Sequence, residues 1–264
     1  MIIGKSKREL EKMRAAGRLV AEVREELRRM VRPGVTTLEL DMEAERMIRD
    51  AGAIPTFKGY HGFPFSICAS VNEQVVHGFP SAYELKEGDI FSLDCGVTLG
   101  GFVGDTATTV PVGRVDEDRL KLIRVAEKCL ENAIQQCWPG KHLGDIGWAV
   151  QELAEAHGYG IVRDYVGHGI GRKMHEDPQI PNYGKPGTGI KIRSGYVFAI
   201  EPMVNMGTHK TKTLKDGWTV VTLDGRPSAH VEHTVAVTEE GPEVLTQVAE
   251  AMPSPPPQAE TASA

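Results

Sequence analysis

The sequence lacks any long hydrophobic run. No stretch approaches the ~20 consecutive apolar residues that a membrane-spanning helix needs, and residues 1–8 hold no apolar core of a secretory signal. The four cysteines are scattered, with no Cys-x-x-Cys pair, so reduced thiols are their expected state. We therefore expect a cytoplasmic protein that has no membrane partner.

Positive charge is scarcer than negative charge. The 30 lysines and arginines are outnumbered by 36 aspartates and glutamates, giving a formal net charge of -6, which argues against stable nucleic-acid binding. We interpret the arginine-rich segment 24–32 as a solvated helix face, with contact to the ribosome surface as the alternative. The hydrophobic share of 41% is typical of a globular chain, and 264 residues suffice for one large domain or two small ones.

Two pairs of amphipathic helices repeat along the chain. Apolar residues at helical spacing predict helices over 9–30 and, after a capping box formed by Thr36 and Glu39, to about residue 50. A second pair is predicted over 118–137 and from about 142 to 158. Three equivalent pairs of positions each differ by 106, namely Pro33 and Pro139, Leu40 and Ile146, and Gly52 and Gly158.

The segment from Asp89 to Asp105 predicts a β-hairpin, because two runs of apolar β-formers flank a glycine-rich turn. If the turn centres between Leu99 and Gly100, Asp94 lies directly opposite Asp105. Like charges opposed in an apolar ladder repel each other, and a cation between them would remove the repulsion. A three-residue loop would instead turn Asp105 to the other face. Simple capping of two strand ends is the alternative, and we favour the metal.

Acidic residues recur at the equivalent strand positions further along the chain. Segment 88–94 aligns with 195–201 at an offset of 107, which places Glu201 at the position of Asp94. Segment 104–110 aligns with 231–237 at an offset of 127, because the second copy carries about 20 extra residues, and Glu232 then takes the position of Asp105. Two acids recurring at matched strand positions indicate a structural repeat.

The repeat predicts an α+β fold built from two pseudo-symmetric αα-β-hairpin halves, about 9–113 and 118–241. Curved antiparallel strands covered by the four helices would bury the apolar stripes and bring the acids to a common axis. Neither half could bury its sheet face alone, so a single domain is expected over 1–245. The Pro/Ala/Ser-rich segment 246–264 is expected to be a disordered tail.

A histidine between glycines offers a further ligand to this axis. His168 stands in Gly-His-Gly-Ile-Gly, where the backbone can approach an ion or a substrate closely. A lone histidine is more often a surface or core residue, but four converging acids need cations. Four carboxylates and one histidine suit Mn, Fe or Co. His77 and His175 are candidates for groups just outside the ligand shell.

Together these motifs resemble the signature set of the methionine aminopeptidases, most closely the bacterial type I form with its pita-bread fold. The resemblance spans roughly residues 5–245. The motifs that carry it are His77-Gly78, Leu93-Asp94, Gly104-Asp105-Thr106, Gly167-His168-Gly169-Ile170-Gly171, His175-Glu176, Ile200-Glu201-Pro202 and Val231-Glu232-His233-Thr234.

The resemblance implies a dinuclear metal centre containing Co, Mn or Fe, with Zn as a further option. Its implied ligands are Asp94, Asp105, His168, Glu201 and Glu232. Asp105 and Glu232 would bridge the two ions, and Glu201 would also act as general base toward the bridging water. His77 and His175 would hold the scissile amide and its carbonyl oxygen.

The resemblance also implies a methionine pocket. Besides His77 and His175, its implied residues are Tyr60, His61, Phe63, Cys68 and Trp218, although aromatic residues are mostly core and only their placement can decide. Met174 replaces an aromatic residue found in many family members, which bears on the pocket's shape. A Na or K ion is implied near Asn72, Gln74 and Ser228.

The implied function is removal of the initiator methionine from nascent chains and peptides with a small second residue, by a monomer whose metal-activated water attacks the scissile carbonyl. An X-Pro aminopeptidase or prolidase is the first alternative. It would need a sizeable extra N-terminal domain, for which the roughly 90 residues before Asp94 leave no room. A non-catalytic pita-bread binding protein is the second, but such relatives lose ligands that are all in place here.

Overall fold

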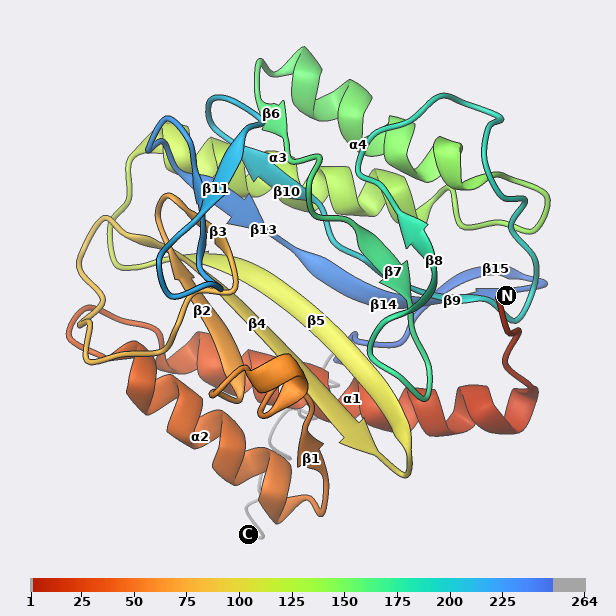
Figure 1. Cartoon of the computed structure of the whole chain (residues 1–264), viewed down its shortest axis with the longest axis horizontal. Coiled ribbons are helices and arrows are strands. Elements are labelled where there is room, and N and C mark those ends of the chain that lie inside the picture. The colour runs from red at the N-terminus through yellow and green to blue at the C-terminus, as the bar shows by residue number, and fades with distance from the viewer. Residues whose placement is uncertain (1, 249–264) are drawn as a thin grey trace, which may run out of the picture.

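The computed structural model describes residues 2–248 (Figure 1). Within this range the α-helices are α1 (Lys7–Met30), α2 (Thr37–Asp50), α3 (Glu117–Ile134) and α4 (Leu143–Ala156), with a short 3-10 helix at Tyr60–Gly62. The predicted capping box of Thr36 and Glu39 begins α2, and Ser6 with Glu9 forms another before α1. The third helix ends three residues before the predicted residue 137. None of the described helices combines the length and hydrophobicity that crossing a membrane requires.

A nine-stranded sheet forms the centre of the molecule, and its strand pairs are antiparallel. Its strands are β1 (Ile54–Pro55), β2 (Ile67–Val71), β4 (Ile90–Leu99), β5 (Phe102–Pro111), β7 (Gly167–Gly169), β8 (Glu176–Ile180), β9 (Val197–Ile200), β14 (Glu232–Thr238) and β15 (Gly241–Val244). The main path runs β1-β4-β5-β14-β9-β7-β8, with β2 beside β4 and β15 beside β14. The expected α+β fold with a curved antiparallel sheet is confirmed.

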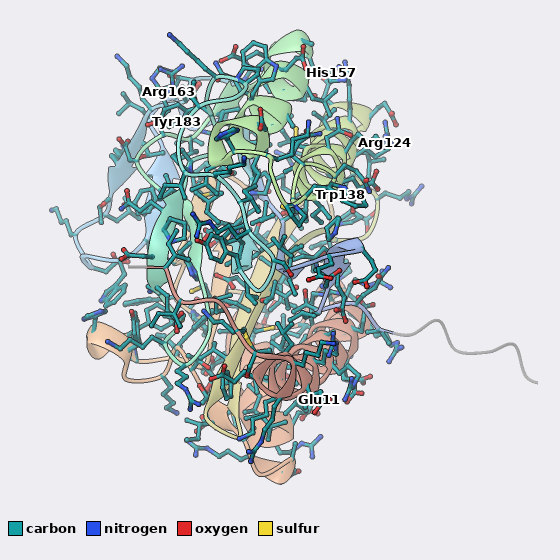
Figure 2. The ribbon with its side chains drawn as sticks, turned by 90° about the vertical axis from the view of Figure 1, so that its right-hand side faces the viewer. Glu11, Arg124, Trp138, His157, Arg163 and Tyr183 are labelled. Carbon is teal, nitrogen blue, oxygen red and sulfur yellow. The ribbon has the colours of Figure 1, made fainter. Side chains whose placement is uncertain are left out.

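Two small sheets flank the large one. The first contains β6 (Gly160–Ile161), β10 (Met203–Asn205) and β13 (Ser228–His230), and the second contains β3 (Gln74–Val76), β11 (Thr211–Thr213) and β12 (Val220–Thr222). The helix pair α1–α2 and the pair α3–α4 lie at opposite ends of the molecule (Figure 1; Figure 2). Each pair covers its own half of the sheet.

The predicted register of the β4–β5 hairpin is wrong by two residues. Leu99 pairs with Phe102, so that the turn consists of Gly100 and Gly101, both with positive φ. A two-residue turn with positive φ matches the twist of the strands, and glycine adopts it without steric cost, whereas the predicted centre would have placed Leu99 in the turn. Asp94 therefore faces Ala107 rather than Asp105. Because side chains alternate with a period of two, the shift leaves both acids on one face as diagonal neighbours.

The pseudo-two-fold axis passes between β5 and β14. Thr106 pairs with His233 across these strands, and the two positions differ by 127, which is the repeat offset seen in the sequence. The central pair therefore joins a residue to its own counterpart in the other half. Asp105 and Glu232 are the preceding residues on the two strands, so the repeat brings these two acids together at the axis.

Each half has its own hydrophobic core. In the first half α1 and α2 pack on β4 through a cluster that includes Leu27, Leu40, Phe91 and Leu93. In the second half α3 and α4 pack on β9 and β14 through a cluster that includes Leu122, Ile146, Phe198 and Val235. The helical stripes of the sequence thus fill two cores that meet along β5 and β14.

The arginine-rich part of α1 is not wholly a solvated face. Arg24 is only 8% exposed, and its guanidinium donates a 2.7 Å hydrogen bond to Oγ1 of Thr106. Arg28 and Arg29 do lie at the surface, where each pairs with a glutamate three residues earlier. Arg24 lies on the core-facing side of the helix, and its side chain can be buried there because the sheet beneath it offers a polar partner.

The expected boundary at residue 245 also needs correction. Thr246, assigned to the tail, is fully buried, and its Oγ1 lies 2.8 Å from Nδ1 of His233 and accepts a hydrogen bond from the amide of Thr234. The folded structure therefore includes residue 246. The structure describes residues up to 248, and the part of the expected tail from residue 249 onward lies outside the described residues.

We expect Gly17→Ala to destabilise the protein even though alanine favours helices. A Cβ at residue 17 would lie 2.3 Å from the carbonyl oxygen of Leu245, a backbone atom that cannot turn aside. Helix propensity would return about 1 kcal/mol, whereas overpacking of this severity costs about 3 kcal/mol or more. Urea unfolding should therefore show a net loss of about 2 kcal/mol.

The control is Arg18→Ala, at an exposed position of the same helix. It should change the free energy of unfolding by less than about 0.5 kcal/mol. A Gly17→Ala variant as stable as the unchanged protein would contradict the close approach of α1 to residue 245.

Candidate metal centre

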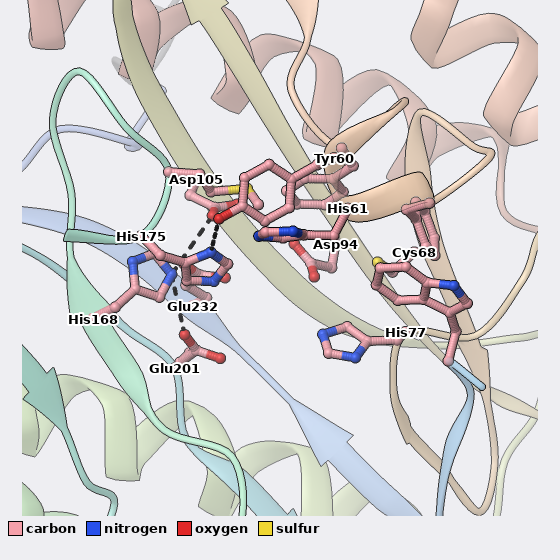
Figure 3. A pocket seen from close by; sticks show the side chains of 14 residues that line it. Tyr60, His61, Cys68, His77, Asp94, Asp105, His168, His175, Glu201 and Glu232 are labelled. Carbon is pink, nitrogen blue, oxygen red and sulfur yellow. Dashed lines mark hydrogen bonds and ion pairs between the residues drawn. The ribbon is translucent and has the colours of Figure 1, made fainter. Parts of the chain in front are cut away.

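A cavity of about 270 Å³ opens at the axis between the two halves (Figure 3). Its walls contain all five predicted metal ligands and all seven predicted substrate residues, together with Phe57 and Met174. The lining residues are Phe57, Tyr60, His61, Phe63, Cys68, His77, Asp94, Asp105, His168, Met174, His175, Glu201, Trp218 and Glu232. Residues separated by more than a hundred positions in sequence thus share one site.

The five predicted ligands come from five consecutive strands of the sheet. Asp94 lies on β4, Asp105 on β5 and Glu232 at the start of β14, while Glu201 directly follows β9 and His168 lies on β7. These strands are neighbours in the order β4-β5-β14-β9-β7. Adjacent strands lie about 4.8 Å apart, which is a suitable spacing for side chains that converge on one small cluster.

The ligand atoms lie close together. One ligand atom from each of Asp105, His168 and Glu232 falls within 4.8 Å of the other two. Nε2 of His168 is 3.5 Å from Oε1 of Glu201 and 4.0 Å from Oδ2 of Asp105 (Figure 3). Separations of this size are those expected between donors that share a cation, since each metal–ligand bond is about 2.0–2.2 Å long.

Three carboxylate oxygens of the buried acids have no hydrogen-bond partner among the described residues. Oδ1 of Asp94, Oδ1 of Asp105 and Oε1 of Glu232 are buried and accept no hydrogen bond from the described residues. Burial, reinforced by the charge of Asp105, raises the pKa values of Asp94, Glu201 and Glu232 well above the usual range. Burial also raises the pKa of Asp105, to about 7. Divalent cations would compensate these charges.

His168 has the protonation state that a metal ligand needs. Burial, with a smaller contribution from His175, lowers its pKa to about 3, so the ring is neutral at pH 7. Nδ1 lies 3.0 Å from the carbonyl oxygen of Gly169, and we assign the proton to Nδ1 because only an N–H can bond that oxygen. The lone pair of Nε2 is then free to face the acids. The donor set therefore fits divalent metal ions.

The opposite wall of the cavity is aromatic and apolar. Phe63 packs edge-on against Trp218 with ring centroids 5.1 Å apart. Cys68 is buried, and it pairs with Asp94 across β2 and β4. Burial raises the pKa of its thiol well above the usual value, and the charge of Asp94 adds to this effect. Phe57, Tyr60 and Phe63 are therefore pocket walls as well as core, the alternative that the sequence alone left open.

Two histidines stand between the acids and the aromatic wall. Nδ1 of His175 lies 2.8 Å from the hydroxyl of Tyr60, which fixes the ring, and that ring lies over His168 with centroids 4.2 Å apart. Burial lowers the pKa of His77 to about 4. His61 and His77 both have positive φ, a backbone strain that concentrates at functional sites.

An ion pair from the N-terminal segment holds the loop that carries His175. Nζ of Lys5 lies 2.6 Å from Oε2 of Glu176, and the two side chains are only 7% and 18% exposed. The other oxygen of Glu176 accepts from the amide of Lys173. The loop cannot shift without breaking these contacts, so residues far from the hairpins help to fix the position of His175.

The three residues expected near a monovalent cation lie outside the cavity. The amide of Ser228 donates to the carbonyl oxygen of Asn72, which brings the two segments together. Each of their side chains is already used: Asn72 bonds Asp89 and Ile90, Gln74 accepts from Val71, and Ser228 donates to Asn205.

Sequence reasoning missed two residues of the site, Phe57 and His230. Phe57 completes the apolar wall with Met174, whose bearing on the pocket was expected, and no local motif distinguishes Phe57 from a core residue. His230 is buried with its Nε2 3.8 Å from Oε2 of Glu201. It stands two residues before Glu232, and the period-two alternation along an extended segment was the one signal that pointed to it.

Comparison with known proteins finds relatives over nearly the whole chain. Residues 11–239 match the model of metallopeptidase family M24. The chain is 54% identical to a methionine aminopeptidase of Clostridium perfringens and 53% identical to methionine aminopeptidase 1 of Bacillus subtilis, covering 94% of this chain and 100% of each relative.

Solved structures agree with the sequence matches. The methionine aminopeptidase of Rickettsia prowazekii has a TM-score of 0.92 at 45% identity, over 94% of this chain and 100% of that one. The prolidase of Pyrococcus horikoshii has a TM-score of 0.76 at 19% identity and is covered to only 65% of its length. This second likeness concerns the fold alone.

In metal-free protein, we expect Asp94→Asn to become more stabilising as the pH rises. Burial raises the pKa of Asp94 in the folded state. The stability associated with the protonated acid is therefore complete below its unfolded pKa, near 4, and is lost as the pH rises toward the folded value. Asparagine does not titrate. Relative to the unchanged protein, the variant should therefore be more stable at pH 8 than at pH 5.

Urea unfolding after treatment with a chelator measures this difference. Asp118→Asn, at an exposed position on α3, is the control and should shift stability equally at both pH values. A constant difference between Asp94→Asn and the unchanged protein would show that the acid is not destabilised by its surroundings.

Proposed function

Because this chain belongs to the methionine aminopeptidases of metallopeptidase family M24, and is therefore a metal-dependent hydrolase, we propose that it removes the initiator methionine from nascent proteins and peptides. The observation that supports this most directly is a cluster of buried carboxylates, three of which have an oxygen without a hydrogen-bond partner among the described residues, in the same cavity as an apolar aromatic wall. A free peptide N-terminus beside the acids and an apolar side chain against the wall would occupy both parts of the cavity.

Two divalent ions are proposed to bind at Asp94, Asp105, His168, Glu201 and Glu232, with Asp105 and Glu232 as the bridging ligands. Bound there, Co, Mn, Fe or Zn would supply Lewis acidity that polarises the scissile carbonyl and makes water more acidic. The five side chains hold these charges in fixed positions, because each is carried by or next to a strand of the same sheet.

Glu201 is the proposed general base. Its carboxylate faces the cavity, with Oε1 3.5 Å from Nε2 of His168, so it stands where a positioned carboxylate can accept a proton from a water at the ligand cluster. It would take the proton from the attacking water and return it to the leaving amine. Neutral His77 and His175 would donate hydrogen bonds to the scissile peptide.

Methionine selectivity is proposed to come from Phe63, Cys68 and Trp218, with His61 and Tyr60 at the rim and Phe57 and Met174 closing the wall. Such a surface suits an unbranched thioether, because sulfur makes favourable contacts with aromatic rings. A preference for a small second residue is carried over from the family resemblance.

Four further expectations stay predictions. A Na or K ion near residues 72, 74 and 228 would have to use main-chain carbonyls, since the side chains there are engaged. A ribosome contact would rest on Arg28, Arg29 and Arg32 without Arg24, which is buried. We also expect a monomer and, since nascent chains are the substrate, a cytoplasmic location.

Removing the metal should abolish activity. Protein treated with a chelator is expected not to cleave Met-Ala-Ser, and addition of Mn²⁺, Co²⁺ or Fe²⁺ should restore cleavage, as followed by release of free methionine. Magnesium is the control ion and should restore much less, because its preference for oxygen ligands suits His168 poorly. Rapid cleavage of Ala-Pro-Ala with none of Met-Ala-Ser would favour the prolidase-like alternative.

Glu201→Gln should keep the fold and lose most of the rate. The amide is nearly isosteric with the carboxylate but accepts no proton, so kcat should fall about 10²–10⁴-fold. Circular dichroism and thermal unfolding would verify the fold. Glu152→Gln, at an exposed site on α4, should retain full activity. Turnover by Glu201→Gln at the unchanged rate would rule out its assignment as base.

A further inference from the structure

His230 lies buried behind Glu201 with one ring nitrogen unpartnered. The residue is 2% exposed, and its Nε2 is buried and makes no hydrogen bond to the described residues. A buried ring nitrogen without a partner costs free energy, so its retention calls for a functional explanation. Oε2 of Glu201 lies 3.8 Å from this nitrogen.

The two oxygens of Glu201 face different histidines. Oε1 is 3.5 Å from Nε2 of His168, one of the proposed ligands, whereas Oε2 is 3.8 Å from Nε2 of His230. One oxygen is thus directed to the ligand cluster and the other away from it. A carboxylate with this arrangement can be held in place by a hydrogen bond to its outer oxygen, which is a common means of orienting metal ligands.

The backbone beneath His230 is fixed from both sides. Its amide donates to Oγ1 of Thr109, and the same hydroxyl donates to its carbonyl oxygen at 2.7 Å. On the other side, His230 pairs with Met203 across β13 and β10. The imidazole therefore approaches Glu201 from a rigid strand. The 3.8 Å separation exceeds an N–H···O bond by about 0.6–1.1 Å, a distance that small side-chain torsions can close.

We propose that His230 is a positioning residue for Glu201: its Nε2–H donates to Oε2 and holds the carboxylate with Oε1 toward His168. The gap is too short for a bridging water, which would need a hydrogen bond on each side. This inference rests on the proposed function, because it assigns Glu201 to the metal centre. His230 itself contacts neither metal nor substrate.

The decisive test compares His230→Gln with His230→Phe. Glutamine keeps an N–H donor with similar reach, whereas phenylalanine keeps the ring shape and removes the donor. Titration calorimetry of metal-free protein with Mn²⁺ should show a 10–100-fold loss of affinity for His230→Phe and less than about threefold for His230→Gln. With saturating Mn²⁺ and Met-Ala-Ser, kcat should fall for His230→Phe while its KM stays within about twofold.

The matched control is His233→Phe, which changes a half-buried histidine that lies on β14 and bonds Thr246. It should bind Mn²⁺ as tightly as the unchanged protein. His230→Leu serves as a second donor-free variant if His230→Phe unfolds, and thermal unfolding of metal-free protein verifies each fold.

Two results would overturn the proposal. Equal Mn²⁺ affinity and kcat in the donor-free variant and the unchanged protein would mean that His230 does not hold Glu201. An equal loss in His230→Gln and His230→Phe would mean that the donor is not what matters. Failure of the proposed function is distinguishable, because then the unchanged protein would itself cleave no methionyl peptide.

Discussion

Mutual repulsion among buried carboxylates is the constraint on which this structure depends. Asp94, Asp105, Glu201 and Glu232 converge on one cavity, and burial raises the pKa of each, reinforced for the other three by the charge of Asp105. A fold selected only for stability would not gather four acids where solvent cannot screen them. The arrangement is tolerable when cations share the site, so the free energy lost in assembling the acids is recovered as affinity for metal.

The sheet meets this constraint through its strand order. Because the halves are joined at β5 and β14, and because Thr106 pairs with its own counterpart His233, the repeat places Asp105 and Glu232 beside the axis without any special loop. The flanking strands then add Asp94 and Glu201. Histidine, tyrosine and tryptophan from connecting segments line the rest of the cavity, so rigid strands hold the charges and loops shape the pocket.

Sequence was sufficient for the repeat and for the face of each acid, but not for the register. The offsets of 106, 107 and 127 follow from particular residues, such as Pro33 with Pro139, and the axis pair confirms the last of them. The turn at Gly100 and Gly101 shifted the strand pairing by two residues. Because side chains alternate with a period of two, such a shift keeps every side chain on its expected face, so the pattern of faces cannot reveal it. The burial of Arg24 against Thr106 was not foreseen because the two residues are distant in sequence, and alternation before Glu232 could indicate the face of His230 but not its approach to Glu201.

The two halves differ in one buried charge on their equivalent helices, and this difference separates helix packing from support of the metal centre. The counterpart of Arg24 on α1, 106 positions on, is Leu130 on α3, and both are buried against the sheet. Helix packing at this position therefore does not need a charge. Arg24 instead bonds Thr106, whose hydroxyl donates to the carbonyl oxygen of Glu232. Since Glu232 is a proposed ligand, the buried guanidinium links α1 to the backbone of the metal centre, a role that leucine could not fill.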